Sequence, residues 1–118
     1  MKQKIITKEI EKLFDRFPLY SQEGKGDDAR VLCKIFNPYG GQRWYILEAG
    51  EKQADGDRQL FVLTTCDGEA EYGYMMLSDL TQTTVRVSVC GMTARLHFER
   101  DGWFKGTIAD AKRESRVA

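Results

Sequence analysis

The side chains best suited to chemistry in this 118-residue chain are carboxylates and tyrosines in its middle. Tyr72 directly follows Glu71, and Tyr74 lies two positions further along the chain. Glu48 is the last residue of an earlier apolar run. Carboxylates act as general acids and bases, and a tyrosine hydroxyl can transfer a proton. A small carboxylate-dependent enzyme that also uses Arg43 is therefore one interpretation. It requires Glu48, Glu71 and a tyrosine to converge in a concave pocket.

The histidine and cysteine content does not support the other common catalytic or metal sites. His97 is the only histidine, so no Ser-His-Asp or Cys-His arrangement follows from spacing. Cys33, Cys66 and Cys90 are far apart, without a zinc-binding spacing, and lie in apolar, strand-like runs. Free thiols of this kind suit a reducing cytoplasm. We therefore predict no metal, no cofactor and no enzymatic activity.

Residues 37–45, NPYGGQRWY, could be either a ligand-cradling loop or the tip of a hairpin. A phosphate loop needs backbone N–H groups that converge on an anion, usually at a helix N-terminus. This stretch leads into a strand and has neither a GK[ST] nor a GxGxxG pattern. Proline followed by glycines is ordinary turn chemistry. We predict a hairpin with Tyr39 exposed at its tip, where loops often carry recognition residues.

Charge is unevenly distributed along the chain, although the formal net charge is zero. Residues 27–84 contain ten acidic and five basic residues, and the segments on either side are basic. A face formed by Asp55, Asp57, Glu69 and Glu71 would attract a partner with a basic surface. The alternative is that these carboxylates are only solvated.

A single-stranded nucleic acid is another candidate partner. Aromatic side chains on an antiparallel sheet can stack unpaired bases. The aromatic candidates are Tyr39, Trp44, Tyr72, Tyr74, Trp103 and Phe104. This binding mode also needs a basic groove, but the basic candidates Arg86, Arg95 and Arg100 lie in the C-terminal third, away from the acidic middle.

The elements that position these residues follow from hydrophobic periodicity. Residues 7–17, TKEIEKLFDRF, have the apolar spacing of a helix, with Thr7 as its N-cap and Pro18 ending it. The strand candidates are residues 30–36, 43–48, 59–66, 71–77, 84–90 and 94–98. Their short, turn-like connections favour antiparallel hairpins. We predict an α+β fold with one N-terminal helix packed on an antiparallel sheet of about five to six strands.

Alternation along the strands predicts which side chains face the core. Trp44 and Tyr45 must point to opposite faces, and the sequence leaves open which of them faces solvent. Glu48 is expected on the Trp44 side of the same strand, and Tyr72 and Tyr74 are expected to share a face.

The C-terminal third contains the cleanest alternation in the chain. Val85, Val87 and Val89 are expected to point inward, with polar residues between them pointing outward. We expect residues 1–118 to form one domain. The C-terminal tail, residues 107–118, could start a short helix, but it is polar and is expected to fray.

Four blocks, PLYSQEG, KIFNPYGGQRWYILEAGE, EYGYMMLSDL and RLHFE, occur in this order. The order and spacing resemble domain-of-unknown-function family 2958 over about residues 10–98. The family pattern is a helix, PLYxxE, an FxPxxxWxWYxxE hairpin, E-x-GYxSLxEL and a late strand. Arg95 and His97 stand where the family often has aspartate and an aromatic residue, and Met76 replaces the usual phenylalanine. The resemblance implies a short bacterial protein of plasmids, phages or conjugative elements, and it implies no particular chemistry.

We therefore predict a non-enzymatic, protein-binding accessory factor of a mobile genetic element in the bacterial cytoplasm. A concrete form is an inhibitor of a host defence complex, such as a restriction or CRISPR effector, whose basic nucleic-acid channel would attract the acidic middle. The residues predicted to bind the partner are Tyr39, Arg43, Glu48, Asp55, Asp57, Glu69, Glu71, Tyr72 and Tyr74. No stretch has the length of a membrane span, so we expect no membrane partner.

Overall fold

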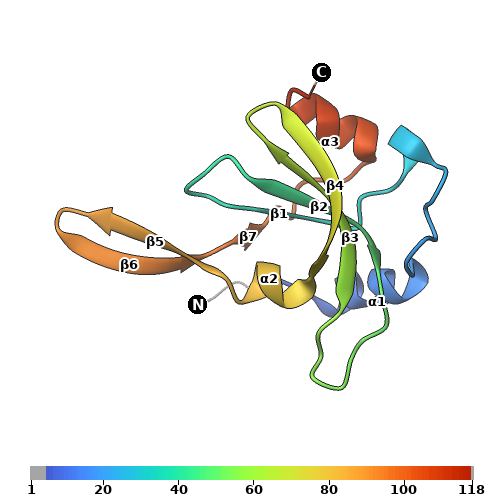
Figure 1. The fold of residues 1–118 in the computed structure, drawn as a ribbon, viewed down its shortest axis with the longest axis horizontal. Coiled ribbons are helices and arrows are strands. Elements are labelled where there is room, and N and C mark those ends of the chain that lie inside the picture. Colours follow the sequence, from blue (N-terminus) through green and yellow to red (C-terminus); the bar gives the residue numbers. More distant parts are fainter. Residues whose placement is uncertain (1–4, 118) are drawn as a thin grey trace.

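The computed structural model describes residues 5–117 (Figure 1). In chain order its elements are α1 Lys8–Arg16, η1 Gly26–Asp28, β1 Cys33–Phe36, β2 Arg43–Ala49, β3 Gln59–Cys66, β4 Glu69–Met76, α2 Leu77–Thr81, β5 Thr84–Val89, β6 Met92–His97, β7 Glu99–Arg100 and α3 Ile108–Glu114. Five strands form one antiparallel sheet in the order β4-β3-β2-β1-β7, and β5 pairs with β6 in a second sheet. The predicted α+β class, with an N-terminal helix and an antiparallel sheet, is confirmed. None of the described helices is long and apolar enough to cross a bilayer.

Helix α1 forms where its periodicity predicts. Thr7 caps it, because its hydroxyl accepts a hydrogen bond from the Ile10 N–H at 3.3 Å. Ile10 and Phe14 are buried in a core that also contains residues of α2 and of the sheet. Burial of a side chain such as Phe14 stabilises the fold by about 1.5–3 kcal/mol. The helix ends at Phe17, since Pro18 disfavours a helical conformation there.

Alternation along β2 separates two cores on opposite faces of the sheet. Ile46 and the half-buried Trp44 pack in the core that contains α1 and α2. Tyr45 and Leu47 pack in the other core, which contains α3. Tyr45 is fully buried, and the Trp44 ring lies 4.6 Å from that of Phe98. Both aromatic side chains are therefore core residues, one on each face.

A β-bulge in β2 reverses the expected position of Glu48. Alternation from Trp44 predicts that Glu48 faces the α1 side. The pairing of β2 with β3 shifts between Ile46 and Glu48, so that Glu48 lies opposite Phe61. Because a bulge adds one residue to the strand, every side chain after it points to the face opposite the one that simple alternation predicts. The hydrophobic pattern of the sequence does not reveal the bulge. Glu48 consequently faces the α3 side, together with Leu47.

Strands β5 and β6 form a hairpin, residues 84–97, that projects from the body and that we call the arm (Figure 1). Val85 packs against the α1-side core, but Val89 is 63% exposed. The prediction that the three valines point inward is wrong at Val89, because only the root of the arm reaches the core. Cys90 also lies exposed in the turn of the arm, whereas Cys33 is buried.

The C-terminal tail contains helix α3. Helix α3 places Ile108 and Ala111 on one face, since they are three residues apart, and both are fully buried. The Ile108 N–H donates to the Ala29 carbonyl at 2.9 Å, which joins the start of α3 to the chain after η1. The other side chains of this helix are mostly polar, so the two buried residues hold it against the sheet.

A buried ionic network holds the end of α3 against the sheet. The Lys34 ammonium, 7% exposed, lies 2.9 Å from an Asp101 oxygen and 2.7 Å from a Glu114 oxygen. The Tyr45 hydroxyl donates to the same Glu114 oxygen at 2.5 Å and lies 2.9 Å from the Ser115 hydroxyl. Desolvation and the Glu114 carboxylate raise the pKa of Tyr45, so its hydroxyl stays protonated and able to donate.

Candidate functional site

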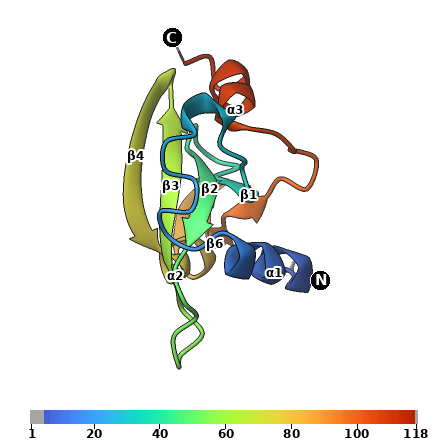
Figure 2. The ribbon, with the colours of Figure 1, turned by 90° about the vertical axis from the view of Figure 1, so that its right-hand side faces the viewer.

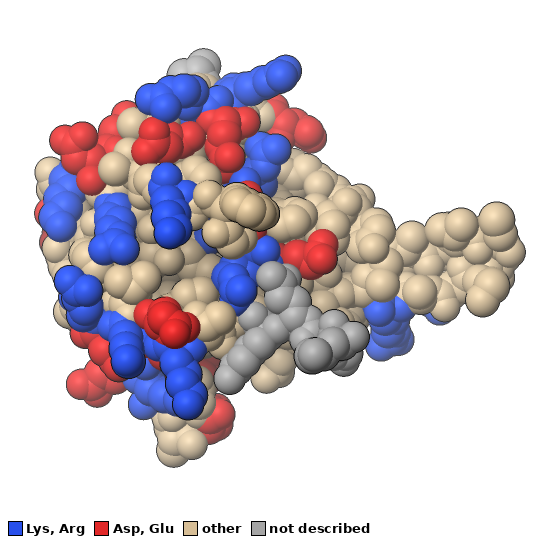
Figure 3. Space-filling view, turned by 180° about the vertical axis from the view of Figure 1, so that it is seen from behind, with Lys and Arg blue, Asp and Glu red and all other residues tan. Residues whose placement is uncertain are grey.

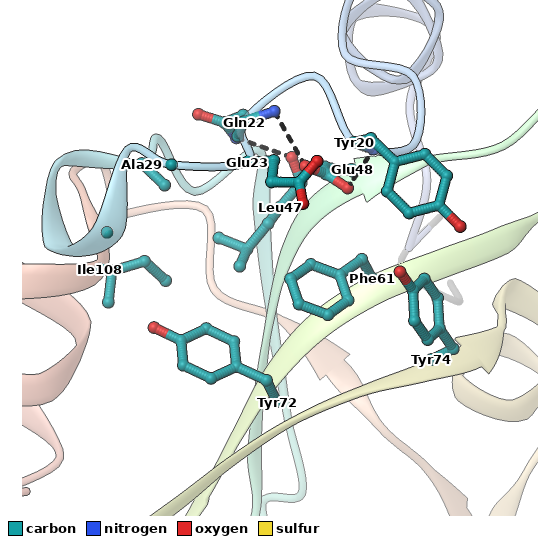
Figure 4. Close-up of a pocket in the computed structure, with 12 residues that line it drawn as sticks. Tyr20, Gln22, Glu23, Ala29, Leu47, Glu48, Phe61, Tyr72, Tyr74 and Ile108 are labelled. Atoms are coloured by element: carbon teal, nitrogen blue, oxygen red, sulfur yellow. Dashed lines mark hydrogen bonds between the residues drawn. The ribbon is translucent and has the colours of Figure 1, made fainter.

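An open pocket of about 350 Å³ lies where the loop between α1 and η1 faces β3 and β4. In Figure 2 this loop crosses in front of β2 and β3, with β4 at the edge of the sheet. Figure 4 shows the pocket with Phe61 on its floor and Tyr20, Tyr72 and Tyr74 around it. We call these four side chains and the space between them the tyrosine groove. Ile108 of α3 closes its far end, and its volume is within the range of ligand-binding pockets.

The register of β3 and β4 brings two of the tyrosines together, as predicted. Tyr72 pairs with Leu63 and Tyr74 with Phe61, so all four side chains lie on the α3 face of the sheet. The Phe61 ring is stacked on Tyr72, with centroids 5.8 Å apart, and lies 5.0 Å from the Tyr74 ring. Tyr72 and Tyr74 are nevertheless 44% and 50% exposed, because nothing among the described residues covers the groove.

The opposite wall of the tyrosine groove is a loop that Glu48 and Gln22 hold in place. The backbone N–H groups of Tyr20 and Gln22 donate to the two Glu48 carboxylate oxygens at 2.7 and 2.9 Å. The Gln22 side chain donates to the Arg30 and Leu47 carbonyls, each at 2.7 Å. Tyr20 adopts a left-handed φ of 72°, and its side chain is 64% exposed. Because bonds to a carboxylate are strong, Tyr20 is held in position before any partner binds.

The lining of this pocket is anionic. It contains the carboxylates Glu23 and Glu48 and no lysine, arginine or histidine. The pKa of Tyr74 is raised, first by desolvation and then by the Tyr20 hydroxyl and the two carboxylates. Of these causes, the charges of Glu23 and Glu48 disfavour a second negative charge and favour a positive one. The tyrosine groove is therefore suited to a ligand that combines apolar surface with a positive charge.

Of the predicted partner-binding residues, Glu48, Tyr72 and Tyr74 belong to this site. Arg43 does not, because it is half-buried and donates to the Ser115 hydroxyl at 3.3 Å, beside the end of α3. Tyr39 lies at the tip of the β1–β2 hairpin, as predicted, and is 54% exposed. Its role in binding stays a prediction.

The four acidic residues predicted to form one face lie at opposite ends of β3. Asp55 and Asp57 precede β3, and Asp57 accepts hydrogen bonds from the Ser78 N–H at 2.9 Å and the Ser78 hydroxyl at 2.7 Å. These bonds, the hydroxyl bond first, lower the pKa of Asp57 and tie its turn to α2. Glu69 pairs with the last residue of β3, and Glu71 follows two residues later. These four carboxylates therefore do not form a single acidic face.

The structure also does not bring Glu48 and Glu71 together. Glu71 pairs with Thr64, and the side chains of adjacent residues alternate, so Glu71 lies on the face opposite Tyr72. Glu48 lies on the Tyr72 side because of the bulge. Among residues 5–117, no group of three or more His, Cys, Asp or Glu side chains could hold a metal ion.

Tyr20, Glu23 and Phe61 are among the residues of the site that were not predicted from the sequence. Tyr20 and Glu23 lie in the PLYSQEG block, which resembles the PLYxxE pattern and is the signal that could have identified them. Phe61 lies in a strand that is apolar on both faces, so alternation does not show which face it joins. Their convergence depends on the bulge and on the loop contacts.

The fold and the site define a small α+β protein with an open pocket that is lined by aromatic and acidic side chains. The family model described as "Protein of unknown function (DUF2958)" matches residues 5–115. The chain therefore belongs to this family, in agreement with the resemblance of its sequence blocks. No curated protein and no solved structure matches the chain.

Proposed function

We propose that this protein is a non-enzymatic binding factor that receives a basic, partly apolar segment of a partner protein in the tyrosine groove. The observation that carries the proposal is the exposure of Tyr20, Tyr72 and Tyr74, at 64%, 44% and 50%, around one anionic pocket. Tyrosine is enriched at protein interfaces because it offers a large contact area, a hydroxyl and few rotatable bonds.

A lysine or arginine side chain of the partner fits this site best. Its charge would lie over the tyrosine rings, an interaction of about 0.5–2 kcal/mol depending on desolvation. The Glu23 and Glu48 carboxylates line the same pocket and add attraction. The aliphatic part of the side chain, or an apolar neighbour, would cover Phe61 and Ile108 on the floor and at the end of the groove.

We further propose that the partner belongs to a host defence complex, such as a restriction or CRISPR effector, and that binding occurs in the bacterial cytoplasm. The support is the family resemblance, which implies an accessory protein of a mobile genetic element. A defence complex has a basic nucleic-acid channel that would supply the cationic side chains. This version relies on the tyrosine groove and no longer on an acidic face from Asp55 to Glu71.

The proposal is tested by a tagged pull-down from host lysate, with and without nuclease, read by mass spectrometry. We expect a stoichiometric protein partner that survives nuclease treatment and is lost when Tyr72 and Tyr74 are both replaced by alanine. Truncation of an interface tyrosine in a central position costs about 2 kcal/mol or more, so the double change lowers affinity at least about 30-fold. Trp103→Ala is the control, because Trp103 is also an exposed aromatic residue but lies outside the groove and is not among the residues predicted to bind the partner.

Two outcomes would contradict the proposal. Equal capture by the wild type and the Tyr72→Ala, Tyr74→Ala variant would remove the tyrosine groove as the binding site. Recovery that disappears with nuclease would indicate a nucleic acid as the direct ligand. If Tyr39→Ala alone abolished capture, the β1–β2 hairpin would replace the groove as the interface.

A further inference from the structure

The arm, residues 84–97, has two chemically different faces. On one face Arg86 lies directly opposite Arg95, and Ser88 lies opposite Thr93 with their hydroxyl oxygens 3.2 Å apart. The other face is apolar and consists of Val85, Val87, Val89, Met92, Ala94 and Leu96. Successive side chains of a strand point to opposite sides, so the strict alternation in both strands produces this separation.

The polar face of the arm carries positive charge that no carboxylate balances. Residues 84–97 contain no aspartate or glutamate. Among residues 5–117, neither Arg86 nor Arg95 forms an ion pair. Figure 3 shows basic side chains and no acidic ones along the visible length of the arm. Like charges directly opposite each other destabilise a hairpin, and a polyanion bound across both arginines would remove this repulsion.

The arm is fixed at its root and free at its tip. At the root, Phe98 is buried and packs against Trp44, and Val85 packs against the same core. At the tip, Cys90 and Gly91 have φ values of 52° and 77°, which matches a tight two-residue hairpin turn. Val89 and Met92 flank this turn and are 63% and 76% exposed. An amphipathic two-stranded ribbon therefore extends into solvent.

We propose that the arm binds duplex DNA, with Arg86 and Arg95 on the phosphates and the apolar tip in the major groove. The major groove of B-DNA is about 12 Å wide and admits a two-stranded ribbon. Arginine, serine and threonine side chains are common donors to phosphate oxygens, and all three occur on the polar face. The arm would enter the groove tip first, so that Val89 and Met92 beside the turn contact thymine methyl groups. The long side chains of Arg86 and Arg95, three residues behind them in each strand, would then reach the phosphates at the rim.

The composition of the arm favours duplex DNA over the other nucleic acids. Residues 84–97 contain no phenylalanine, tyrosine or tryptophan, so the arm lacks the large aromatic rings on which the bases of a single strand stack. The major groove of duplex RNA is too narrow for side chains to read. This binding uses the arm and not the tyrosine groove, so it is independent of the proposed protein partner.

The test is the salt dependence of binding to a short fluorescently labelled DNA duplex, measured by anisotropy with the full chain. Each neutralised phosphate contributes about 0.9 to the slope of log K against log salt concentration. Replacing Arg86 and Arg95 by alanine should therefore reduce the slope by about 1.8. The control is Lys25→Ala with Arg113→Ala, which removes the same charge from exposed positions in the α1–η1 loop and in α3, and it should leave the slope unchanged.

Further variants separate the electrostatic and apolar contributions. Arg86→Lys with Arg95→Lys keeps both charges and should retain the slope. A retained slope would show that the alanine variant loses it through the loss of charge and not through a folding defect. Val89→Thr with Met92→Thr should weaken binding at every salt concentration without changing the slope, because no charge is removed. The exposed Cys90 thiol provides a direct probe of the tip, and bound duplex should slow its reaction with a maleimide.

Several results would overturn the inference. The first is that the duplex does not bind at about 50 mM salt. The second is that the Lys25→Ala, Arg113→Ala control loses as much slope as the arm variant. The third is that the corresponding single strand binds with the same affinity. Unchanged reactivity of Cys90 in saturating duplex would also exclude the arm as the contact surface. Circular dichroism of each variant verifies that the fold is intact.

Discussion

Glu48 offers the most direct test of how the tyrosine groove is assembled. It is 3% exposed, and its two carboxylate oxygens accept the backbone N–H groups of Tyr20 and Gln22, which are 28 and 26 residues away in the chain. Glu48→Gln keeps the shape of the side chain but replaces one acceptor oxygen by an amide NH₂. One of the two backbone N–H groups then faces a donor instead of an acceptor.

The expected cost follows from these two bonds. A hydrogen bond to a charged acceptor contributes about 1.5–3 kcal/mol, and a buried donor left without a partner costs about 1–3 kcal/mol. We therefore expect Glu48→Gln to destabilise the closed loop by at least about 2 kcal/mol. Because 1.4 kcal/mol is a factor of ten, the amides of Tyr20 and Gln22 should exchange with solvent at least about 30-fold faster.

The assay is native-state hydrogen exchange followed by NMR, with urea unfolding measured in parallel. Glu51→Gln is the matched control, since Glu51 lies three residues further along and is exposed. It should change neither the exchange of the loop amides nor the unfolding free energy by more than about 0.5 kcal/mol. Unchanged protection of both amides in Glu48→Gln would refute the role of this carboxylate in holding the loop.

Three further predictions concern the ionic network and the exposed aromatic residues. Lys34→Met leaves two partly buried carboxylates without their cation, and we expect it to lower the unfolding free energy by about 2–4 kcal/mol in urea titrations. Desolvation acts to raise the pKa of Asp101, but hydrogen bonds from Lys34 and from the loop that follows keep it below 3.8 in the fold. The stabilisation from Asp101 is thus complete above the unfolded pKa and lost as pH falls through the folded pKa, so thermal melts of Asp101→Asn should show a weaker decline in acid. Trp103 is 96% exposed and Trp44 half-buried, so Trp103→Phe should remove most acrylamide-quenchable fluorescence and change stability by less than about 0.5 kcal/mol.

Local patterns were sufficient for the elements whose stability depends on nearby residues. Helix α1 has its cap, its apolar face and its terminating proline within twelve residues, and all three act as predicted. The hairpin tip at residues 37–42 closes through the Asn37 N–H and the Gln42 carbonyl, 3.0 Å apart. Pro38 and the glycines that follow encode this turn without help from the rest of the chain.

The same patterns were insufficient where a segment needs a distant partner. Residues 84–89 alternate as a core strand does, yet they belong to an arm, because alternation indicates an amphipathic strand and not what covers its apolar face. The tail was expected to fray because it is polar. Ile108 and Ala111 of the tail are buried because they pack in the same core as Tyr45 and Leu63 of the sheet, which are distant in the sequence.

Residue patterns alone were enough to predict the α+β class, α1, the antiparallel hairpins, the shared face of Tyr72 and Tyr74, and the family. These features depend on periodicity, turn chemistry and ordered blocks, which are properties of neighbouring residues. The convergence of Tyr20 and Glu23 with the two tyrosines, in contrast, depends on tertiary contacts. The physical reason is that one bulge reverses the face of Glu48, and its carboxylate then binds a loop more than twenty-five residues away.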